Sequence, residues 1–373
     1  MIVTRTAFER RISSALSGPP PRIPFILGGS GSGRTTILRN IHRQLGSSSC
    51  QYVDVERTAT TPERFLRALV QASPFHGGEP ERGPTTPRQA FDDTLAYLTM
   101  VRAASGEPAT ILLDEVLELR TFESFPGLRH AFQELLTALA PGGNRFVLTS
   151  RYPARASRLL RSLPDVFLVV HASPMTRDEL GELVAGSIAQ ASPAGSEPPS
   201  AEWLADTAAA IEVLSQGRPA YADAIMGVMT ATRRQRADVD PVSALSVLLA
   251  PDGQLSIRCA FCYELRLHRA RGYGALKAIL EVLSEEEPLT LTEISQRLGR
   301  TPGSTKDYLS WLEDVDLVDS QRKRYRFADP LLRLWVRLYC RTVPPTEEDV
   351  AREVRTFALA RLPRAEAPAA API

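Results

Sequence analysis

Residues 24–36 read Pro-Phe-Ile-Leu-Gly-Gly-Ser-Gly-Ser-Gly-Arg-Thr-Thr, and this segment is the strongest indication of the fold of the chain. Gly28 and Gly33 lie five positions apart, and Thr35 stands where a phosphate-binding loop requires serine or threonine. The apolar residues before the loop predict a strand, and the amphipathic residues after it predict a helix. Glycines let successive backbone N–H groups turn inward around a phosphate, and the start of a helix adds unpaired donors and a positive dipole end. The stretch therefore predicts a phosphate-binding P-loop.

The residues expected to contact a nucleotide come from this loop and the first turn after it. They are Gly28, Gly29, Ser30, Gly31, Ser32, Gly33, Arg34, Thr35 and Thr36. The hydroxyl of Thr35 is placed to bind Mg²⁺. Arg34 stands where the P-loop pattern has lysine, and its planar guanidinium is broader than an ammonium group. We expect Arg34 to hold phosphates, and the pattern leaves open whether it reaches between the β- and γ-phosphates.

A second motif follows about eighty residues later, where residues 109–115 read Ala-Thr-Ile-Leu-Leu-Asp-Glu. A buried strand of this kind carries Asp114 to its end, where the carboxylate can hold Mg²⁺ together with Thr35. Glu115 can then polarise an attacking water, which makes it a candidate catalytic residue. Residues 146–151 end another strand in Thr-Ser-Arg, and Arg151 is the second catalytic candidate because it could neutralise charge during phosphoryl transfer. The alternative is that Arg151 begins a solvated, arginine-rich helix.

Short apolar stretches alternate with amphipathic ones over the first 172 residues, which predicts an α/β fold with a parallel sheet. The expected strands are residues 23–27, 51–55, 109–113, 145–149 and 166–170, and the expected helices are residues 35–44, 62–72, 87–104 and 128–139. The predicted domains are a P-loop ATPase core (1–172), a helical lid (173–255), a winged-helix domain (256–345) and a C-terminal helix with a disordered tail (346–373).

The third region has the element order of a winged helix-turn-helix. Its expected parts are helices at residues 273–283, 291–298 and 302–314 and a hairpin at residues 320–327. Ser304, Thr305 and Lys306 are expected to face a groove, and the basic wing at residues 321–326 would lie on phosphates. Acidic residues on and after the same helix make the face mixed in charge, so docking on a protein is the alternative to contact with DNA.

The overall composition narrows the class of protein further. Forty-four basic residues against 43 acidic ones give a net charge of +1, which argues against a protein built mainly to coat nucleic acid or an anionic membrane. No apolar run is long enough to cross a bilayer, no signal peptide is recognisable, and four cysteines are too few for a disulfide framework. Cys259 and Cys262 have zinc-like spacing but no second pair of ligands nearby. We therefore expect a cytoplasmic protein without a membrane partner.

Taken together, the P-loop, the Asp114-Glu115 strand and the Thr-Ser-Arg strand end resemble the STAND class of AAA+-related ATPases, in particular its archaeal-type branch. Residues 217–221 (Gly-Arg-Pro-Ala-Tyr) stand where these proteins carry a Gly-x-Pro motif in the lid. Residues 325–339 are similar to the Asp-Pro-hydrophobic-Trp stretch that follows their winged helix. The resemblance implies an ASCE-type P-loop NTPase sheet in the order 5-1-4-3-2, ATP with Mg²⁺ as cofactors, and Pro219 packed near the adenine.

These observations predict an ATP-binding switch protein, a slow ATPase whose nucleotide state positions the winged helix on a partner protein, on a second copy of the chain or on DNA. Two alternatives stay open. One is a nucleotide-regulated or non-hydrolysing DNA-binding transcription regulator, which the Arg34 substitution favours. The other is an oligomeric AAA+ motor, which would need an arginine supplied by a neighbouring subunit.

Overall fold

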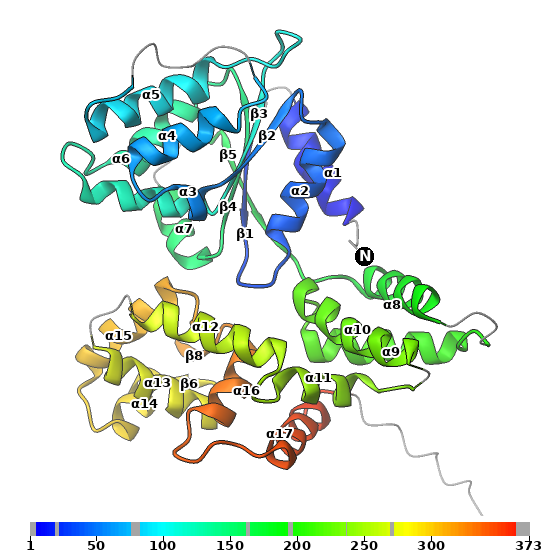
Figure 1. Cartoon of the computed structure of the whole chain (residues 1–373). Helices are drawn as coiled ribbons and strands as arrows, with labels where there is room; N and C mark the ends of the chain where they lie inside the picture. The colour runs from blue at the N-terminus through cyan, green and yellow to red at the C-terminus, as the bar shows by residue number, and fades with distance from the viewer. Residues whose placement is uncertain are drawn as a thin grey trace, which may run out of the picture. The chain divides into compact units, whose positions relative to one another are not determined.

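A parallel five-stranded sheet organises the N-terminal half of the computed structural model (Figure 1). The structure describes residues 5–18, 22–75, 83–161, 165–192, 197–235, 237–268 and 272–362. The strands are β1 (Ile23–Leu27), β2 (Cys50–Asp54), β3 (Thr110–Asp114), β4 (Arg145–Ser150) and β5 (Phe167–His171). Their order, β2-β3-β4-β1-β5, is the predicted one read from the opposite edge. All residues of β1 and β3 are buried, as expected for strands that are covered on both faces.

Helices cover both faces of this sheet. Figure 1 shows α1 (Thr6–Ser17) and α2 (Arg34–Leu45) on one face, and α4 (Pro62–Gln71), α5 (Pro87–Met100) and α6 (Ala131–Leu139) on the other. The shorter elements are α3 (Val55–Thr58), η1 (Val116–Ser124) and α7 (Pro153–Leu160). Both α4 and α5 begin with proline after a threonine whose hydroxyl caps the helix, which fixes where they start.

The sequence analysis did not predict helix α1. Phe8, Ile12 and Leu16 recur at a spacing of four residues, and all three are buried against β1, α2 and their neighbours. This spacing is the signal that could have identified the helix. The helix predicted at residues 87–104 is too long, since α5 ends at Met100 and Val101 is its C-cap residue.

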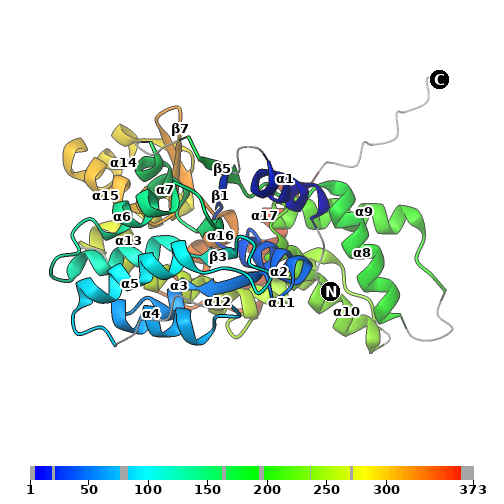
Figure 2. The ribbon, with the colours of Figure 1, turned by 90° about the horizontal axis from the view of Figure 1, so that it is seen from above.

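The C-terminal half divides from the sheet region after Ser173, since residues 2–173 form one compact unit and residues 174–373 form a second. The second unit begins with a bundle of α8 (Arg177–Ala191), α9 (Ala201–Ser215) and α10 (Pro219–Arg234), which pack on one another (Figure 2). The next helix, α11 (Pro241–Leu249), packs on α9 and α10. We call α8–α11 the lid helices.

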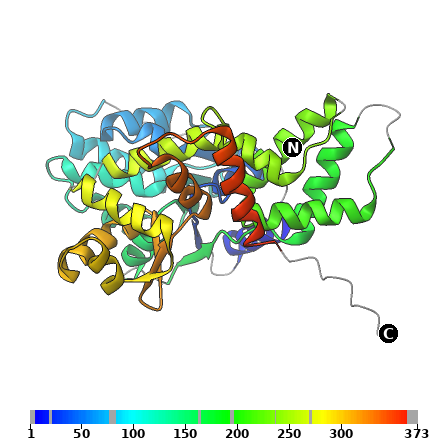
Figure 3. The ribbon, with the colours of Figure 1, turned by 90° about the horizontal axis from the view of Figure 1, so that it is seen from below.

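The remainder of the second unit contains a winged-helix module. Its elements are α12 (Gln254–His268), α13 (Tyr273–Glu285), β6 (Leu289–Thr290), α14 (Leu291–Arg297), α15 (Pro302–Asp314), β7 (Val318–Gln321), β8 (Arg324–Phe327) and α16 (Pro330–Tyr339). The three strands form an antiparallel sheet in the order β6-β8-β7, and the buried faces of the helices share one apolar core. The last helix, α17 (Glu347–Leu359), packs on both α11 and α16 (Figure 3).

Two expectations from the sequence bear on the rest of the chain. Among the helices of the described residues, none combines the length and the apolar character that a membrane span requires. The tail expected after residue 362 lies outside the described residues.

Candidate functional site

The glycine-rich loop connects β1 to α2 and has the backbone that its sequence predicts. Gly31 and Gly33 have φ angles of +81° and +84°, and Gly33 is the N-cap of α2. These left-handed values favour glycine at both positions. At Gly28 a Cβ would lie 2.6 Å from the Oγ of Ser32 and 2.9 Å from the Cβ of Ala172. Glycine is therefore required here by close packing, and α2 starts at the loop with its first N–H groups directed towards it.

Arg34, the residue in the lysine position, is folded back onto the loop and is only 7% exposed. Its Nη1 donates to the carbonyl oxygen of Gly28, to the carbonyl oxygen of Gly29 at 2.7 Å and to the Oγ of Ser32 at 3.0 Å. Its Nη2 donates to the Oε1 of Glu115 at 2.6 Å, which forms a buried ion pair. Arg34 therefore joins the glycine-rich loop to the acidic motif on β3.

Glu115 directly follows β3 and is held at several points. Its φ of +58° is left-handed, which is unusual for a residue with a side chain and is typical of functional sites. Its N–H donates to the Oγ1 of Thr149, and its Oε2 accepts from the backbone N–H of Arg151 at 2.9 Å. Burial raises the pKa of Glu115, but the charges of Arg34 and Arg151 outweigh burial and hold that pKa below its ordinary value. Glu115 thus lies between two arginines, and each forms an ion pair with its carboxyl group.

Asp114 and Thr35, the two predicted metal ligands, lie in direct contact. The hydroxyl of Thr35 donates to the Oδ2 of Asp114 at 2.7 Å, and the hydroxyl of Tyr52 donates to the same oxygen at 2.9 Å. The Oγ1 of Thr149 donates to Oδ1 at 2.5 Å. A hydroxyl and a carboxylate side by side are oxygen ligands of the kind that Mg²⁺ prefers. No group of three or more His, Cys, Asp or Glu that could hold a metal ion occurs within the described ranges.

Arg151 contacts the same site from the end of β4. Its Nε lies 3.2 Å from the Oε2 of Glu115, and its Nη2 forms an ion pair with the Oε2 of Glu56 on α3. Burial lowers the pKa of Arg151, but the two carboxylates outweigh this effect and raise it. The side chain is 19% exposed and precedes α7, which begins at Pro153. The structure therefore places Arg151 among the candidate catalytic residues and not on the face of a solvated helix.

Tyr52 and Glu56 were missed by the sequence analysis. Tyr52 lies within β2, and Glu56 lies on α3 directly after that strand, where no motif marks either residue. The pairing of β2 with β3, which places Asp54 opposite Asp114, brings both side chains to the site. The strand order implied by the family resemblance was the only sequence-level signal that could have identified them.

Pro219, the remaining predicted nucleotide contact, belongs to the second unit, where it is the first residue of α10. Its contact with adenine stays a prediction.

The winged-helix module corrects one expectation. Thr305 was expected to face a groove together with Ser304 and Lys306, but it is fully buried and its hydroxyl donates to the carbonyl oxygen of Thr301. It lies on the inner face of α15 with Leu309, four positions further along the helix. Lys306 is exposed, as expected.

The wing presents its basic residues unequally. Arg322 and Lys323 form the turn between β7 and β8, where both have left-handed φ angles and both are exposed. Arg326, on β8, forms an ion pair of 3.2 Å with Asp319 on β7. Because Arg326 is neutralised locally, the turn carries the positive charge that is available to a partner.

Comparisons with known proteins agree with this architecture. A family model described as winged helix-turn-helix DNA-binding matches residues 275–319. The chain is similar to the solved structure of a Walker-type ATPase of Pyrococcus abyssi, with a TM-score of 0.63, 16% sequence identity and coverage of 90% of this chain and 96% of that one. The chain has the fold of a P-loop ATPase with a winged-helix domain. No curated protein sequence matches it.

Two further solved structures are more distant. A variant of RuvB from Thermotoga maritima has a TM-score of 0.43 and 14% identity, with coverage of 87% of this chain and 92% of that one. Drosophila ORC bound to DNA has a TM-score of 0.35 and 13% identity, with coverage of 85% and 90%. TM-scores this low do not establish a shared fold.

Proposed function

We propose that the chain is an ATP-binding switch of the STAND class, with slow ATPase activity, in which nucleotide state controls the winged-helix module. The observation that carries this proposal is the junction of two motifs at one sheet edge. Thr35 and Arg34 of the loop bond directly to Asp114 and Glu115 of β3, so the predicted phosphate, metal and water-activating groups occupy one site. The Walker-type fold similarity supports the same assignment.

Each residue of the site has a proposed role in nucleotide binding or hydrolysis. The loop N–H groups and Arg34 would hold the phosphates, and Thr35 and Asp114 would hold Mg²⁺, which supplies charge neutralisation at the phosphate oxygens. Glu115 would orient a water and accept its proton, and Arg151 would stabilise charge on the transferred group. A carboxylate whose pKa is lowered by two arginines is a weak base, which supports slow hydrolysis in this proposal.

Titration calorimetry on the full chain tests the proposal. ATP, ADP and GTP are compared with Mg²⁺ and with EDTA. We expect Mg²⁺-dependent ATP binding that is weakened at least tenfold by Asp114→Ala. Asp54→Asn is the matched control because Asp54 ends the neighbouring strand but caps its own helix α3. Absence of binding by any nucleotide to well-folded protein, or equal binding by Asp114→Ala, would contradict the proposal.

A second candidate function is DNA binding through the winged helix, and the family model over residues 275–319 favours it. We expect Arg322→Gln with Lys323→Gln to reduce the slope of log K against log salt by about 1.8, since each lost phosphate contact contributes about 0.9. Arg326→Gln is the control, because Arg326 is already paired with Asp319. Binding that does not depend on salt, or that is unchanged in the double variant, would favour docking on a protein.

A further inference from the structure

Two segments that are far apart in the sequence bond to each other inside the second unit. The Nη1 of Arg218 forms an ion pair of 3.1 Å with the Oδ2 of Asp329, and its Nη2 donates to the carbonyl oxygen of Ala328 at 2.5 Å. The hydroxyl of Tyr221 donates to the same Oδ2 of Asp329. Tyr221 and Asp329 are both buried. We call Arg218, Tyr221 and Asp329 the Asp329 cluster.

The Asp329 cluster joins the lid helices to the winged-helix module. Arg218 and Tyr221 flank Pro219 at the start of α10, whereas Asp329 is the N-cap of α16. The second carboxylate oxygen, Oδ1, accepts from the N–H of Leu331 at 3.0 Å and caps that helix. One carboxylate therefore uses one oxygen to cap α16 and the other to bind α10. Removing a partner would leave a buried charge or donor unsatisfied, which makes the connection hard to open.

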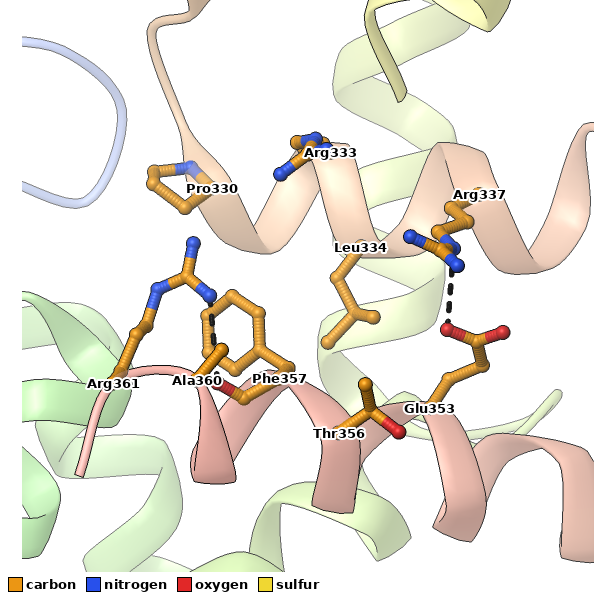
Figure 4. Close-up of a pocket in the computed structure, with 9 residues that line it drawn as sticks. All are labelled: Pro330, Arg333, Leu334, Arg337, Glu353, Thr356, Phe357, Ala360 and Arg361. Atoms are coloured by element: carbon orange, nitrogen blue, oxygen red, sulfur yellow. Dashed lines mark hydrogen bonds and ion pairs between the residues drawn. The ribbon is translucent and has the colours of Figure 1, made fainter. Parts of the chain in front are cut away.

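Another bond joins the same two parts. The hydroxyl of Tyr339 on α16 donates to the carbonyl oxygen of Leu249, the last residue of α11, at 2.7 Å. Figure 4 shows α17 beside α16, with Arg337 of α16 paired to Glu353 of α17 at 3.2 Å. Because α17 also packs on α11, it bridges the lid helices and α16.

The segment that enters the second unit is anchored on both sides of one peptide bond. On the core side, the N–H of Ala172 donates to the carbonyl oxygen of Leu27, and Arg5 donates to the carbonyl oxygen of Ser173, both at 2.7 Å. On the other side, the N–H of Met175 donates to the carbonyl oxygen of Gly217 at 2.7 Å. The chain between these anchors is therefore only Ser173–Pro174.

We propose that the lid helices and the winged-helix module move as one rigid body, which turns on the Ser173–Pro174 segment and is held together by the Asp329 cluster. Residues 174–373 form one compact unit, which supports this. The claim that nucleotide drives this motion rests on the proposed function. The claim that the lid helices and the winged-helix module form one rigid body does not.

Spin-label distances in the full chain test the rigidity of the second unit and its response to nucleotide separately. Cysteines replace three exposed residues, namely Gln133 on α6 of the first unit, Glu202 on α9 and Ser310 on α15. The background carries Cys262→Ser and Cys340→Ser. We expect the distance between positions 202 and 310 to have one narrow distribution that is the same with and without ATP and Mg²⁺. A bimodal distribution of this distance, or one that shifts with nucleotide, would overturn the rigid-body proposal.

The distance between positions 133 and 310 reports on the proposed function. If this distance does not change with nucleotide, the proposed switch function is wrong, whereas the rigid-body proposal can still be right. If both distances respond, the winged helix moves independently of the lid and the inference is wrong.

Asp329→Asn tests the cluster itself. Asparagine keeps an oxygen for the cap of α16 but replaces the oxygen that accepts from Arg218 and Tyr221. We expect the width of the distribution between positions 202 and 310 to at least double. Asp240→Asn, which changes another capping aspartate in the same unit, is the control and should leave the width unchanged. If Asp329→Asn does not fold, Tyr221→Phe removes one bond only and should still broaden the distribution. An unchanged width in every folded cluster variant would refute the role of the cluster.

Discussion

The ion pair between Arg34 and Glu115 makes a specific prediction about nucleotide affinity. The Nη2 of Arg34 is bound to Glu115 at 2.6 Å, while its Nη1 is occupied by the loop. A bound γ-phosphate must therefore compete with the Glu115 carboxylate for the guanidinium. Glu115→Gln removes the charge of this competitor without removing its side chain. We expect the variant to bind ATP more tightly than the wild type and to hydrolyse it more slowly.

The size of the effect follows from the hydrogen bond that changes. A bond between charged groups contributes about 1.5–3 kcal/mol, whereas a neutral acceptor such as glutamine contributes about 0.5–1.5 kcal/mol. The difference, about 1–1.5 kcal/mol, corresponds to an increase in affinity of roughly tenfold. Loss of the proposed general base should lower turnover by about 10²–10⁴-fold.

Calorimetry with ATP and Mg²⁺, together with a phosphate-release assay, measures both effects. Glu56→Gln is the matched control, because it removes a carboxylate from the same site that is paired to Arg151 and not to Arg34. We expect its affinity to change by less than about threefold, the range of a modest electrostatic term. Equal affinities for Glu115→Gln and the wild type, or equal gains in both variants, would refute competition for Arg34.

Three further predictions concern stability, measured by urea unfolding. The pKa of Glu115 is held below its ordinary value of 4.5 by two arginines. The wild type should therefore have a higher free energy of unfolding than Glu115→Gln above about pH 4.5, and this difference should decline as the pH falls further. A difference in free energy of unfolding that does not change with pH would contradict this. Thr149→Val removes the hydroxyl that bonds to the Oδ1 of Asp114 and to the N–H of Glu115, and should cost about 1–3 kcal/mol; a neutral effect would show that water replaces the hydroxyl. Gly217→Ala should cost about 1–3 kcal/mol, because its φ is +63° and the new Cβ would lie 2.8 Å from Pro174. Gly227→Ala, inside α10 with open space around it, should stabilise by about 0.5–1 kcal/mol, and equal effects of the two substitutions would refute the packing argument.

Local sequence predicted much of the first unit. All five strands lie within one residue of their predicted positions, because each is a short apolar stretch that ends at polar or glycine residues. Helix α15 has the predicted bounds, since Thr301 caps it and Pro302 begins it. The orientation of Thr305 was wrong because the exposed and buried faces of this helix depend on what α15 packs against.

The contacts between distant residues were not predictable in the same way. The sequence contains Arg34 and Glu115, but not the bond between them, because the residues are 81 positions apart and meet only through the order of the strands. Tyr52 and Glu56 carry no motif and become relevant only because β2 pairs with β3. The same holds for Arg218 and Asp329, which are 111 positions apart.

The glycine-rich loop, the acidic strand end and the winged-helix element order could be predicted from the chain, because each depends on residues that are close together in the sequence. The bond between Arg34 and Glu115 and the bond between α10 and the cap of α16 could be seen only in the folded protein. Ion pairs and buried hydrogen bonds act over a few ångströms in space, and sheet order and helix packing bring these side chains within that distance.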